Sequence, residues 1–372
     1  MWLIGLLALL TLGYAGLILH LKKGWDTMPR YTPGPPNAPL PFITVLIPAR
    51  NEEDNIGILL DALSKQTYPQ EKMEVIVVDD HSTDRTASIA RSYPFVKLIE
   101  LKDDCENSYK KIAIERGIEQ AAGSFIVCTD ADCVPGPEWL ETIACFSQQN
   151  KCAFIAAPVL LENNSSVLGR FQTLDFLVMQ GITAAGIQQQ SIYMANGANM
   201  GYPKKVFESV GGYKGSKQLA SGDDFFLLHK IQKEYPSQIH FIKSEKAIIR
   251  TQAQLTWSGF FQQRIRWASK SSHYNNRSLK LVLLLVGIYN LCLLIVLASS
   301  IVCPPLLLLA LASMLVKSLI EWPFLQSVAS FFKVPINSFQ FFLFQPLHVL
   351  YIPITGILSF QKKYVWKGRE VR

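Results

Sequence analysis

Three pairs of aspartates in this chain of 372 residues could each bind a cation or move a proton. Asp130 and Asp132 lie one residue apart in the run C-T-D-A-D-C, directly after an apolar stretch. Hard carboxylate oxygens suit Mg²⁺ or Mn²⁺, which keep waters and take phosphates as further ligands. The spacing therefore predicts a divalent cation at Asp132 and Asp130. Asp79 and Asp80 form a second pair at the end of another apolar run.

The third pair, Asp223 and Asp224, opens the apolar run G-D-D-F-F-L-L. A carboxylate at an exposed turn can act as a general base, and Asp224 is the candidate for that role, with Asp223 as its neighbour. Every pair also has a purely structural interpretation, because acidic residues cap turns at strand ends and complement the dipole at helix starts. The chemical interpretation therefore depends on the pairs occurring together.

The run Q-Q-R-I-R-W supplies Gln263, Arg264, Arg266 and Trp267. Guanidinium groups bind phosphate oxygens in bidentate geometry, so two arginines beside a tryptophan could clamp a pyrophosphate next to an aromatic platform. The alternative is a basic amphipathic helix that lies on a membrane surface. Both interpretations stay open at this point.

Alternating strands and helices are expected to position these residues. Apolar runs rich in β-branched residues predict buried strands at 42–48, 73–80, 96–101 and 124–132. Apolar residues at helical spacing separate the strands, and Ser82 or Thr83 is the expected cap of one helix. This alternation is typical of an α/β fold with a mostly parallel sheet, in which ligands bind at the carboxyl ends of the strands. Two acidic pairs, and Arg50 to Glu52 after the first strand, lie at those ends.

Apolar stretches elsewhere predict membrane helices. Three of them, of 21, 36 and 27 residues, contain no Asp, Glu, Lys or Arg: 1–21, 281–316 and 334–360. Since a transmembrane helix needs about 20 apolar residues, each stretch can supply at least one, which excludes a purely soluble or disordered protein. The net charge of +7 is not concentrated in one run, so no nucleic-acid partner is expected. The seven cysteines include no C-x-x-C pair and indicate neither a zinc site nor a disulfide framework.

Five segments are expected along the chain. A transmembrane anchor at 1–21 precedes a proline-rich linker at 22–41, a globular domain at 42–280, a membrane region at 281–360 and a basic tail at 361–372. Lys22 and Lys23 directly follow the anchor, so the positive-inside rule places the globular domain in the cytosol.

The middle of the membrane region predicts a turn followed by a short return helix. Two prolines at 304–305 mark the turn, and the return helix is expected at 306–320, with Lys317 and Glu321 near its cytosolic end. On this interpretation no apolar span carries a charged residue that would mark a translocation path.

Two prolines divide the last apolar stretch. Pro346 and Pro353 leave pieces too short to span a membrane separately, which favours a re-entrant or interfacial pair of half-helices over the alternative of a third full span. The tail is then expected on the cytosolic side, in agreement with its basic residues Lys362, Lys363, Lys367, Arg369 and Arg372.

The order of these motifs resembles that of the family 2 glycosyltransferases with a GT-A fold. V-V-D-D-H-S-T-D-R-T, C-T-D-A-D-C, G-D-D-F-F-L and Q-Q-R-I-R-W follow one another as in that family, the last being similar to its Q-[QR]-x-R-W motif. I-P-A-R-N-E-E, K-K-I-A-I-E-R-G-I and N-G-A-N-M-G-Y-P also look like its nucleotide entry, a helix and its acceptor-side loop. The resemblance covers residues 42–267 and points to the groups similar to ceramide glucosyltransferase and to the processive synthases.

The resemblance implies a role for each matching residue. Asp80 would read the nucleoside base with support from Asp79, Asp130 would face the ribose and the cation, and Asp132 would bind the cation directly. Lys110 matches a helix lysine near the nucleotide, although Lys111 fits equally by register. Asp224 matches the catalytic base, and His81 stands where the family usually has glycine. The remaining matches line the nucleoside pocket (Pro48, Arg50, Glu52) or contact diphosphate and acceptor (Gln263, Arg264, Arg266, Trp267).

Together these assignments imply an inverting hexosyl- or N-acetylhexosaminyltransferase. It would use a nucleotide-diphosphate sugar, UDP-linked in the first instance, with Mg²⁺ or Mn²⁺ as cofactor. The acceptor would be membrane-associated, a lipid in preference to a growing glycan, because a polymer channel usually needs more helices. A processive polysaccharide synthase is the alternative, and a non-catalytic membrane protein is less favoured because every acidic site is present. The expected location is a bacterial inner membrane, as a multi-pass protein with a cytosolic catalytic domain.

Overall fold

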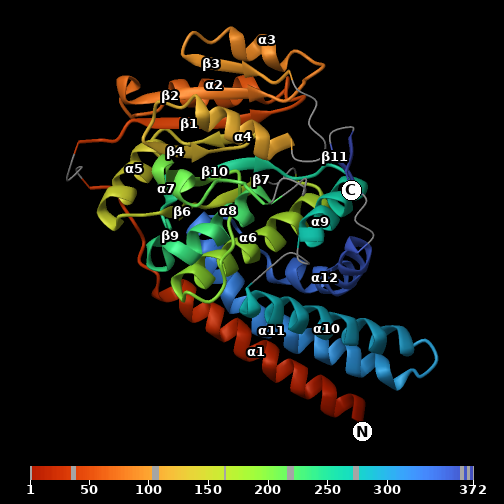
Figure 1. The fold of residues 1–372 in the computed structure, drawn as a ribbon. Helices are drawn as coiled ribbons and strands as arrows, with labels where there is room; N and C mark the ends of the chain where they lie inside the picture. Colours follow the sequence, from red (N-terminus) through yellow and green to blue (C-terminus); the bar gives the residue numbers. More distant parts are fainter. Residues whose placement is uncertain are drawn as a thin grey trace. The chain divides into compact units, whose positions relative to one another are not determined.

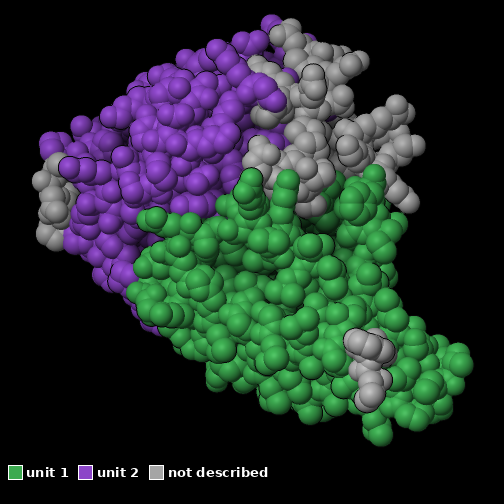
Figure 2. Space-filling model, turned by 60° about the horizontal axis from the view of Figure 1, so that its bottom comes forward, with its two compact units in different colours: residues 1–28, 163–192, 253–364 green, residues 29–162, 193–252, 365–372 purple. Residues whose placement is uncertain are grey.

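The chain folds into two compact units, each built from segments that are distant in the sequence (Figure 2). The computed structural model describes residues 2–34, 39–102, 109–162, 165–215, 222–270, 276–360, 364–366 and 369–371. Unit 1 comprises Met1–Met28, Asn163–Ile192 and Ala253–Tyr364, and unit 2 comprises Pro29–Glu162, Tyr193–Gln252 and Val365–Arg372. The expected domain at 42–280 is therefore divided, because its segments 163–192 and 253–280 pack with the terminal helices.

A seven-stranded sheet forms the centre of unit 2, in the order β3-β2-β1-β4-β8-β6-β9 (Figure 1). The first four strands in sequence are parallel to one another: β1 (Ile43–Ala49), β2 (Met73–Asp79), β3 (Val96–Glu100) and β4 (Phe125–Cys128). β8 (Met200–Pro203) is antiparallel to β4 and to β6 (Phe154–Ala156), which pairs in parallel with β9 (Ile239–Phe241). The α/β fold with a mostly parallel sheet is thereby confirmed.

The apolar runs that predicted the strands are the buried centre of this sheet. Every residue of β4 is buried, and so are all residues of β1 except Pro48. Six helices in the described part of unit 2 connect the strands: α2 (Ile56–Ser64), α3 (Thr86–Arg91), α4 (Tyr109–Glu119), α5 (Trp139–Asn150), α7 (Lys204–Ser209) and α8 (Asp223–Glu234). Three-residue 3₁₀ turns are η1 (Gln70–Lys72), η2 (Pro236–Gln238) and η3 (Glu245–Ala247).

Smaller sheets complete the strand inventory of the described residues. β5 (Cys133–Pro135), β10 (Ile249–Gln252) and β7 (Val159–Glu162) form a three-stranded sheet, and β11 (Tyr364–Trp366) pairs with β12 (Arg369–Val371). The strand expected at 124–132 ends at Cys128, because the chain turns there before β5 joins a different sheet. The acidic pair at 130 and 132 therefore lies in a turn, as a site at the end of a strand requires.

Helix α3 begins later than the sequence predicted. Its first residue is Thr86, and neither Ser82 nor Thr83 caps it. Both side chains instead contact the loop after β1: the backbone amide of Asn51 donates to the Ser82 hydroxyl at 2.9 Å, and the Thr83 amide donates to Asn51 Oδ1 at 2.9 Å. The prediction of an N-cap there was wrong because a tertiary contact takes up these groups.

Among the described residues of unit 1, all regular secondary structure is helical, apart from one residue of β11. Its helices are α1 (Trp2–Thr27), α6 (Val167–Gln188), α9 (Trp257–Ser269), α10 (Arg277–Ser299), α11 (Pro305–Phe332) and α12 (Ser338–Ser359). Four segments among the described residues are long and apolar enough to cross a membrane: Ile4–Thr27, Arg277–Ser299, Pro305–Phe332 and Ser338–Ser359. Helix α1 continues six residues past the expected end of the anchor, so the extended linker begins after Met28, with its residues 35–38 outside the described part.

The last two helices differ most from expectation. α11 has 28 residues instead of a short return, so Lys317 and Glu321 lie in its middle and are buried. α12 is one helix that contains both Pro346 and Pro353, so the prediction of two half-helices was wrong. A packed helix tolerates proline where its neighbours compensate the lost backbone hydrogen bond. Lys362, Lys363, Lys367 and Arg372 of the tail lie outside the described residues, and the half-helix argument for a cytosolic tail no longer holds.

Contacts inside unit 1 fix the relative direction of its long helices. Tyr14 and Asp26 of α1 contact Glu321 and Ser327 of α11 respectively, so the two helices run in the same direction (Figure 1). α10 precedes α11 through a short turn at 300–304 and packs against both. This turn therefore lies at the end of the bundle where α1 begins.

Candidate active site

Two loops at the carboxyl edge of the sheet in unit 2 hold each other through hydrogen bonds. The backbone amides of Glu52 and Glu53, after β1, donate to the side chains of Thr86 and Asp84, after β2, at 2.7 and 3.0 Å. Arg50 donates from Nη1 to the carbonyl oxygen of Asp80 at 2.6 Å. The predicted nucleoside residues of both loops are thereby brought to one edge.

The Asp79–Asp80 pair is buried at the end of β2. Asp79 Oδ2 accepts from the amide of Ser82 at 3.1 Å, which ties the turn, and the ring of His81 contacts Asp80 Oδ1 at 3.0 Å. His81 has a φ of 56°, in the left-handed region that favours glycine. This explains why the resembling family usually has glycine at that position, and gives His81 a conformational part in the turn.

Lys110, at the start of α4, lies between two carboxylates. Its Nζ is 2.6 Å from Asp130 Oδ1 and 3.4 Å from Asp223 Oδ2. Burial by itself lowers the pKa of Lys110, but the carboxylates of Asp130 and Asp223 outweigh burial and raise that pKa above its ordinary range. Lys111 is buried instead, with its Nζ 4.7 Å from the ring centroid of Phe226. Of the two lysines left open by the sequence, Lys110 is therefore the one beside the acidic groups.

Asp224 occupies the first turn of α8 beside a glycine loop. Its Oδ2 accepts from the backbone amide of Gly197 at 3.3 Å, and its Oδ1 accepts from its neighbour Phe225 at 2.7 Å. A Cβ atom at Gly197 would lie 2.9 Å from Asp223 Oδ2 and 3.0 Å from Lys110 Nζ. The backbone can approach this charged cluster so closely only because residue 197 has no side chain.

The donor set near Asp132 fits a cation that is completed by a substrate. Among the described residues, no three His, Cys, Asp or Glu side chains are grouped as a metal cage. Mg²⁺ is commonly bound by one or two carboxylates plus waters and substrate phosphates. Asp130 and Asp132 are both only partly buried, so they match that open type of site and do not match a closed one.

Gln263, Arg264, Arg266 and Trp267 belong to α9 in unit 1, so their environment is described within that unit. Arg264 is buried and donates from Nη2 to Asp175 Oδ2 of α6 at 2.7 Å. Its guanidinium carbon also lies 4.4 Å from the ring centroid of Trp267. The structure thus gives Arg264 a partner inside its own unit, whereas the sequence had grouped it with the diphosphate ligands.

The other motif residues are less enclosed. Arg266 and Trp267 are half-buried, and Trp267 packs against Phe176 of α6 with ring centroids 6.0 Å apart. Arg266 forms no ion pair with any residue that the structure describes. Gln263 Oε1 is buried and has no hydrogen-bond partner in the same part of the chain. These features leave Gln263 and Arg266 able to contact a ligand.

The sequence analysis did not single out three residues that contact the predicted site residues or their partners. Gly197 lies within the predicted acceptor-side loop, but nothing in its type revealed the contact with Asp224. Asp175 had a detectable signal, since it is the one acidic residue within the helical run 167–188. His348, whose Nε2 lies 3.9 Å from Asp175 Oδ1, gave no signal beyond its position in an apolar stretch.

Comparison with known proteins agrees with the motif order. Residues 44–211 match the family model described as Glycosyl transferase family 2. A probable glycosyltransferase, YdaM, from Bacillus subtilis is 28% identical over 236 residues, 62% of this chain and 55% of the relative. A poly-beta-1,6-N-acetyl-D-glucosamine synthase from Staphylococcus epidermidis is 28% identical over 61% of this chain and 53% of its own length. The chain spans about half the length of these curated relatives.

Two further likenesses cover different parts of the chain. A 4,4'-diaponeurosporenoate glycosyltransferase from Staphylococcus aureus is 40% identical over 92 residues, 24% of each protein. The solved structure of a mannosyltransferase from Pyrobaculum calidifontis, in complex with GDP-Man and Mn²⁺, has a TM-score of 0.58 and 19% identity over 97% of both chains. At this identity the second likeness concerns the fold, which is of the GT-A type, with apolar helices in the N- and C-terminal regions.

Proposed function

We propose that the chain is an inverting glycosyltransferase that moves a sugar from a nucleotide-diphosphate sugar to a membrane-associated acceptor. The observation that carries the proposal is the cluster in unit 2 where Lys110, Asp130, Asp223 and Asp224 meet the backbone of Gly197. The cluster lies at the end of β4 and at the starts of α4 and α8, where an α/β sheet binds its ligands.

The nucleoside would bind at the two interlocked loops. Asp80 would read the base and Asp79 would support it, since both carboxylates are held at the end of β2. Pro48, Arg50 and Glu52 would form the remaining wall, because the hydrogen bonds between the loops fix their backbone. Loops held in this way are pre-organised, which reduces the entropy lost on binding.

Asp224 would act as the general base toward the acceptor hydroxyl. A carboxylate hydrogen-bonded to the amide of Gly197 has a fixed direction, and the acceptor-side loop supplies that amide. One base and no enzyme nucleophile correspond to a single displacement, which inverts the anomeric centre. Asp223, paired with Lys110, would hold the start of α8, and with it the general base Asp224, in a fixed position beside the sugar.

The departing diphosphate carries the charge that has to be neutralised. Mg²⁺ or Mn²⁺ held by Asp132 and Asp130 would supply part of that neutralisation, and the Mn²⁺ of the Pyrobaculum calidifontis enzyme supports this choice of ion. Arg266 would donate to the phosphate oxygens, with Gln263 beside it, and Trp267 would provide a surface for the acceptor. Lys110 would hold Asp130 in place and face the nucleotide.

A membrane lipid is the favoured acceptor. Four candidate membrane helices accompany unit 2 in the same chain, and one relative is named a 4,4'-diaponeurosporenoate glycosyltransferase. The alternative is a growing glycan, as in the synthase from Staphylococcus epidermidis. The protein would be a multi-pass protein of a bacterial inner membrane, with unit 2 in the cytosol because Lys22 and Lys23 end the first apolar run.

The test is product identification with the full chain in lipid vesicles. Radiolabelled UDP-glucose, UDP-N-acetylglucosamine and GDP-mannose are each offered with total bacterial lipid. The proposal expects label from one donor in the organic phase after solvent extraction. Label in a water-soluble or insoluble polymer would select the synthase alternative, and no transfer from any donor would overturn the enzyme assignment.

A further inference from the structure

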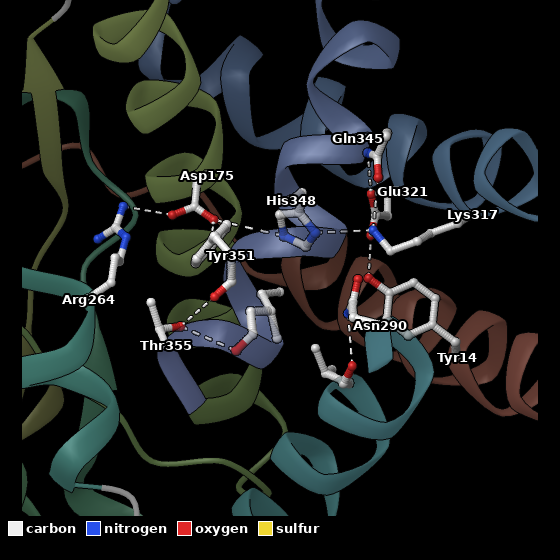
Figure 3. Close-up of polar contacts among 12 residues, drawn as sticks. Tyr14, Asp175, Arg264, Asn290, Lys317, Glu321, Gln345, His348, Tyr351 and Thr355 are labelled. Atoms are coloured by element: carbon white, nitrogen blue, oxygen red, sulfur yellow. Dashed lines mark hydrogen bonds and ion pairs between the residues drawn. The ribbon is translucent and has the colours of Figure 1, made fainter. Parts of the chain in front are cut away.

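A chain of polar side chains, all buried except the partly exposed His348, connects α9, α6, α12, α11 and α1 of unit 1 (Figure 3). At one end, Arg264 of α9 donates to Asp175 of α6, and Tyr351 of α12 donates to the same carboxylate at 2.5 Å. His348 of α12 follows, with its Nε2 3.9 Å from Asp175 Oδ1. The sequence had placed no Asp, Glu, Lys or Arg inside the apolar spans, so this connection is a tertiary feature.

The other end of the network lies around Lys317 of α11. Its Nζ is 2.7 Å from Glu321 Oε1, 2.9 Å from Gln345 Oε1 and 3.2 Å from His348 Nδ1. Gln345 also donates to Glu321 Oε2 at 2.8 Å, and Tyr14 of α1 donates to Glu321. Every group of this cluster therefore has a partner, as intramembrane ionisable groups require.

The geometry fixes the protonation of His348. Nζ of Lys317 has only hydrogens to offer, so Nδ1 of His348 must accept, and the ring proton is on Nε2, facing Asp175. A second ring proton would place two positive groups 3.2 Å apart. The network is then neutral overall, with Lys317 and Arg264 balanced by Glu321 and Asp175.

The network reaches α9, the helix that carries the Q-Q-R-I-R-W run, through the stacked pair of Arg264 and Trp267. The guanidinium that Asp175 holds lies 4.4 Å above the ring of Trp267 and 5.0 Å from the ring of Phe260, all within α9. A shift of the Asp175 carboxylate would therefore shift the Arg264 guanidinium that stacks on the Trp267 ring. Four aromatic and aliphatic side chains around it, Leu168, Phe171, Phe260 and Tyr351, form a packed cluster that limits other adjustments.

We propose that His348 is a positioning residue for glycosyl transfer: it connects the Lys317 cluster of the long helices to Asp175 and Arg264, and so fixes the ring of Trp267. This inference rests on the proposed function, since Trp267 matters only if it contacts the acceptor. Ionisable groups are costly in apolar helices, and the alternative to a positioning role is a set of ion pairs that only holds the helices together.

The experiment compares substitutions at position 348 in the full chain, in lipid vesicles, after normalisation to the folded fraction. His348→Phe keeps a ring and removes both nitrogens, whereas His348→Gln keeps one acceptor and one donor. Asn290→Leu is the control, because Asn290 of α10 is a buried polar residue of unit 1 that donates within its own helix, to Val286. KM and kcat are measured separately for the sugar donor and for the acceptor, together with the midpoint of thermal unfolding.

The proposal expects His348→Phe to lower kcat/KM for the acceptor by about tenfold or more, with KM for the donor within about twofold of wild type. His348→Gln should restore most of the loss, and Asn290→Leu should change stability without changing the ratio of the two KM values. Unchanged acceptor kinetics in folded His348→Phe protein, or an equal loss for donor and acceptor, would overturn the proposal in favour of purely structural ion pairs.

A milder variant keeps the test decisive if His348→Phe does not fold. Tyr351→Phe removes one donor to Asp175 and leaves the ring in the packed cluster. The same selective fall in kcat/KM for the acceptor is expected, at a smaller size, and its absence would overturn the proposal. Failure of the proposed function is recognised separately, because wild-type protein would then transfer no sugar at all.

Discussion

Lys110 Nζ lies 2.6 Å from Asp130 Oδ1, so the first carboxylate of the D-A-D run is paired with a cation that the chain itself supplies. The raised pKa of Lys110 keeps this ammonium charged at any ordinary assay pH. Asp130 therefore already has a cationic partner, and the resemblance assigns the direct contact with the divalent ion to Asp132.

Removal of divalent metal should abolish transfer. We expect chelator-treated vesicles to lose activity and Mn²⁺ or Mg²⁺ to restore it, because the diphosphate needs charge neutralisation as it leaves. Asp132→Asn should raise the Mn²⁺ concentration for half-maximal activity more than Asp130→Asn does. Full activity in the presence of chelator would contradict the assignment of a divalent metal to this site.

Asp224→Asn should lower kcat by roughly 10²–10⁴-fold, which is the usual contribution of a general base. Binding of the nucleotide sugar should survive, since the proposed nucleoside residues lie on other loops. The measurement is kcat beside equilibrium binding of the labelled donor. Asp223→Asn is the comparison: a larger kcat loss there than in Asp224→Asn would move the base to Asp223.

Arg266→Ala and Trp267→Ala should differ in kind. Loss of Arg266 removes a charge contact that strengthens as the diphosphate departs, so kcat should fall with little change in acceptor KM. Loss of Trp267 should mainly raise acceptor KM. Steady-state kinetics with both substrates varied distinguish the two patterns. Identical effects in both variants would indicate that α9 acts only as a structural helix at the membrane surface.

His229 in α8 should make unit 2 less stable in acid. Burial, reinforced by the charge of Lys233, lowers the pKa of His229 from 6.5 to about 4, and its buried Nε2 has no partner among the described residues. Between pH 6.5 and about pH 4, His229 therefore binds a proton in the unfolded chain but stays neutral in the folded chain. Stability is complete above pH 6.5 and falls toward pH 4, by on the order of 2 kcal/mol.

His229→Leu tests the predicted loss of stability at low pH. The midpoint of thermal unfolding is compared at pH 7.5 and pH 5 for each protein, and the acid-induced decrease should be smaller in the variant. Some decrease will persist because burial also lowers the pKa of His240. An equal decrease in both proteins would show that His229 is protonated without cost in the folded state.

Cys303 offers a topology test that needs no engineered residue. It is exposed in the turn between α10 and α11, at the end of the bundle opposite Lys22 and Lys23. If the positive-inside rule holds, a membrane-impermeant maleimide should label Cys303 in intact cells, and Cys303→Ser should abolish that labelling. Labelling only after permeabilisation would place the globular unit on the outer side.

The local pattern of the sequence predicted the first four strands, several of the helices and the positions of the acidic pairs. Hydrophobic periodicity is a property of neighbouring residues, so the strand runs at 42–48 and 73–80 were found to within a residue. The family 2 domain followed from the order of its motifs. Helix ends were less predictable, since Ser82 and Thr83 bond to Asn51 of a distant loop instead of capping a helix.

Only the tertiary structure decided which polar groups meet. Nothing local distinguishes Lys110 from Lys111, and the choice came from which of them faces Asp130 across the sheet edge. Lys317 and Glu321 looked like the end of a short span because charge is costly in lipid. Partners from α1 and α12, more than twenty residues away in sequence, satisfy them inside the bundle. Contacts between distant segments remove the cost that the sequence alone suggests, so they determine where buried charge is allowed.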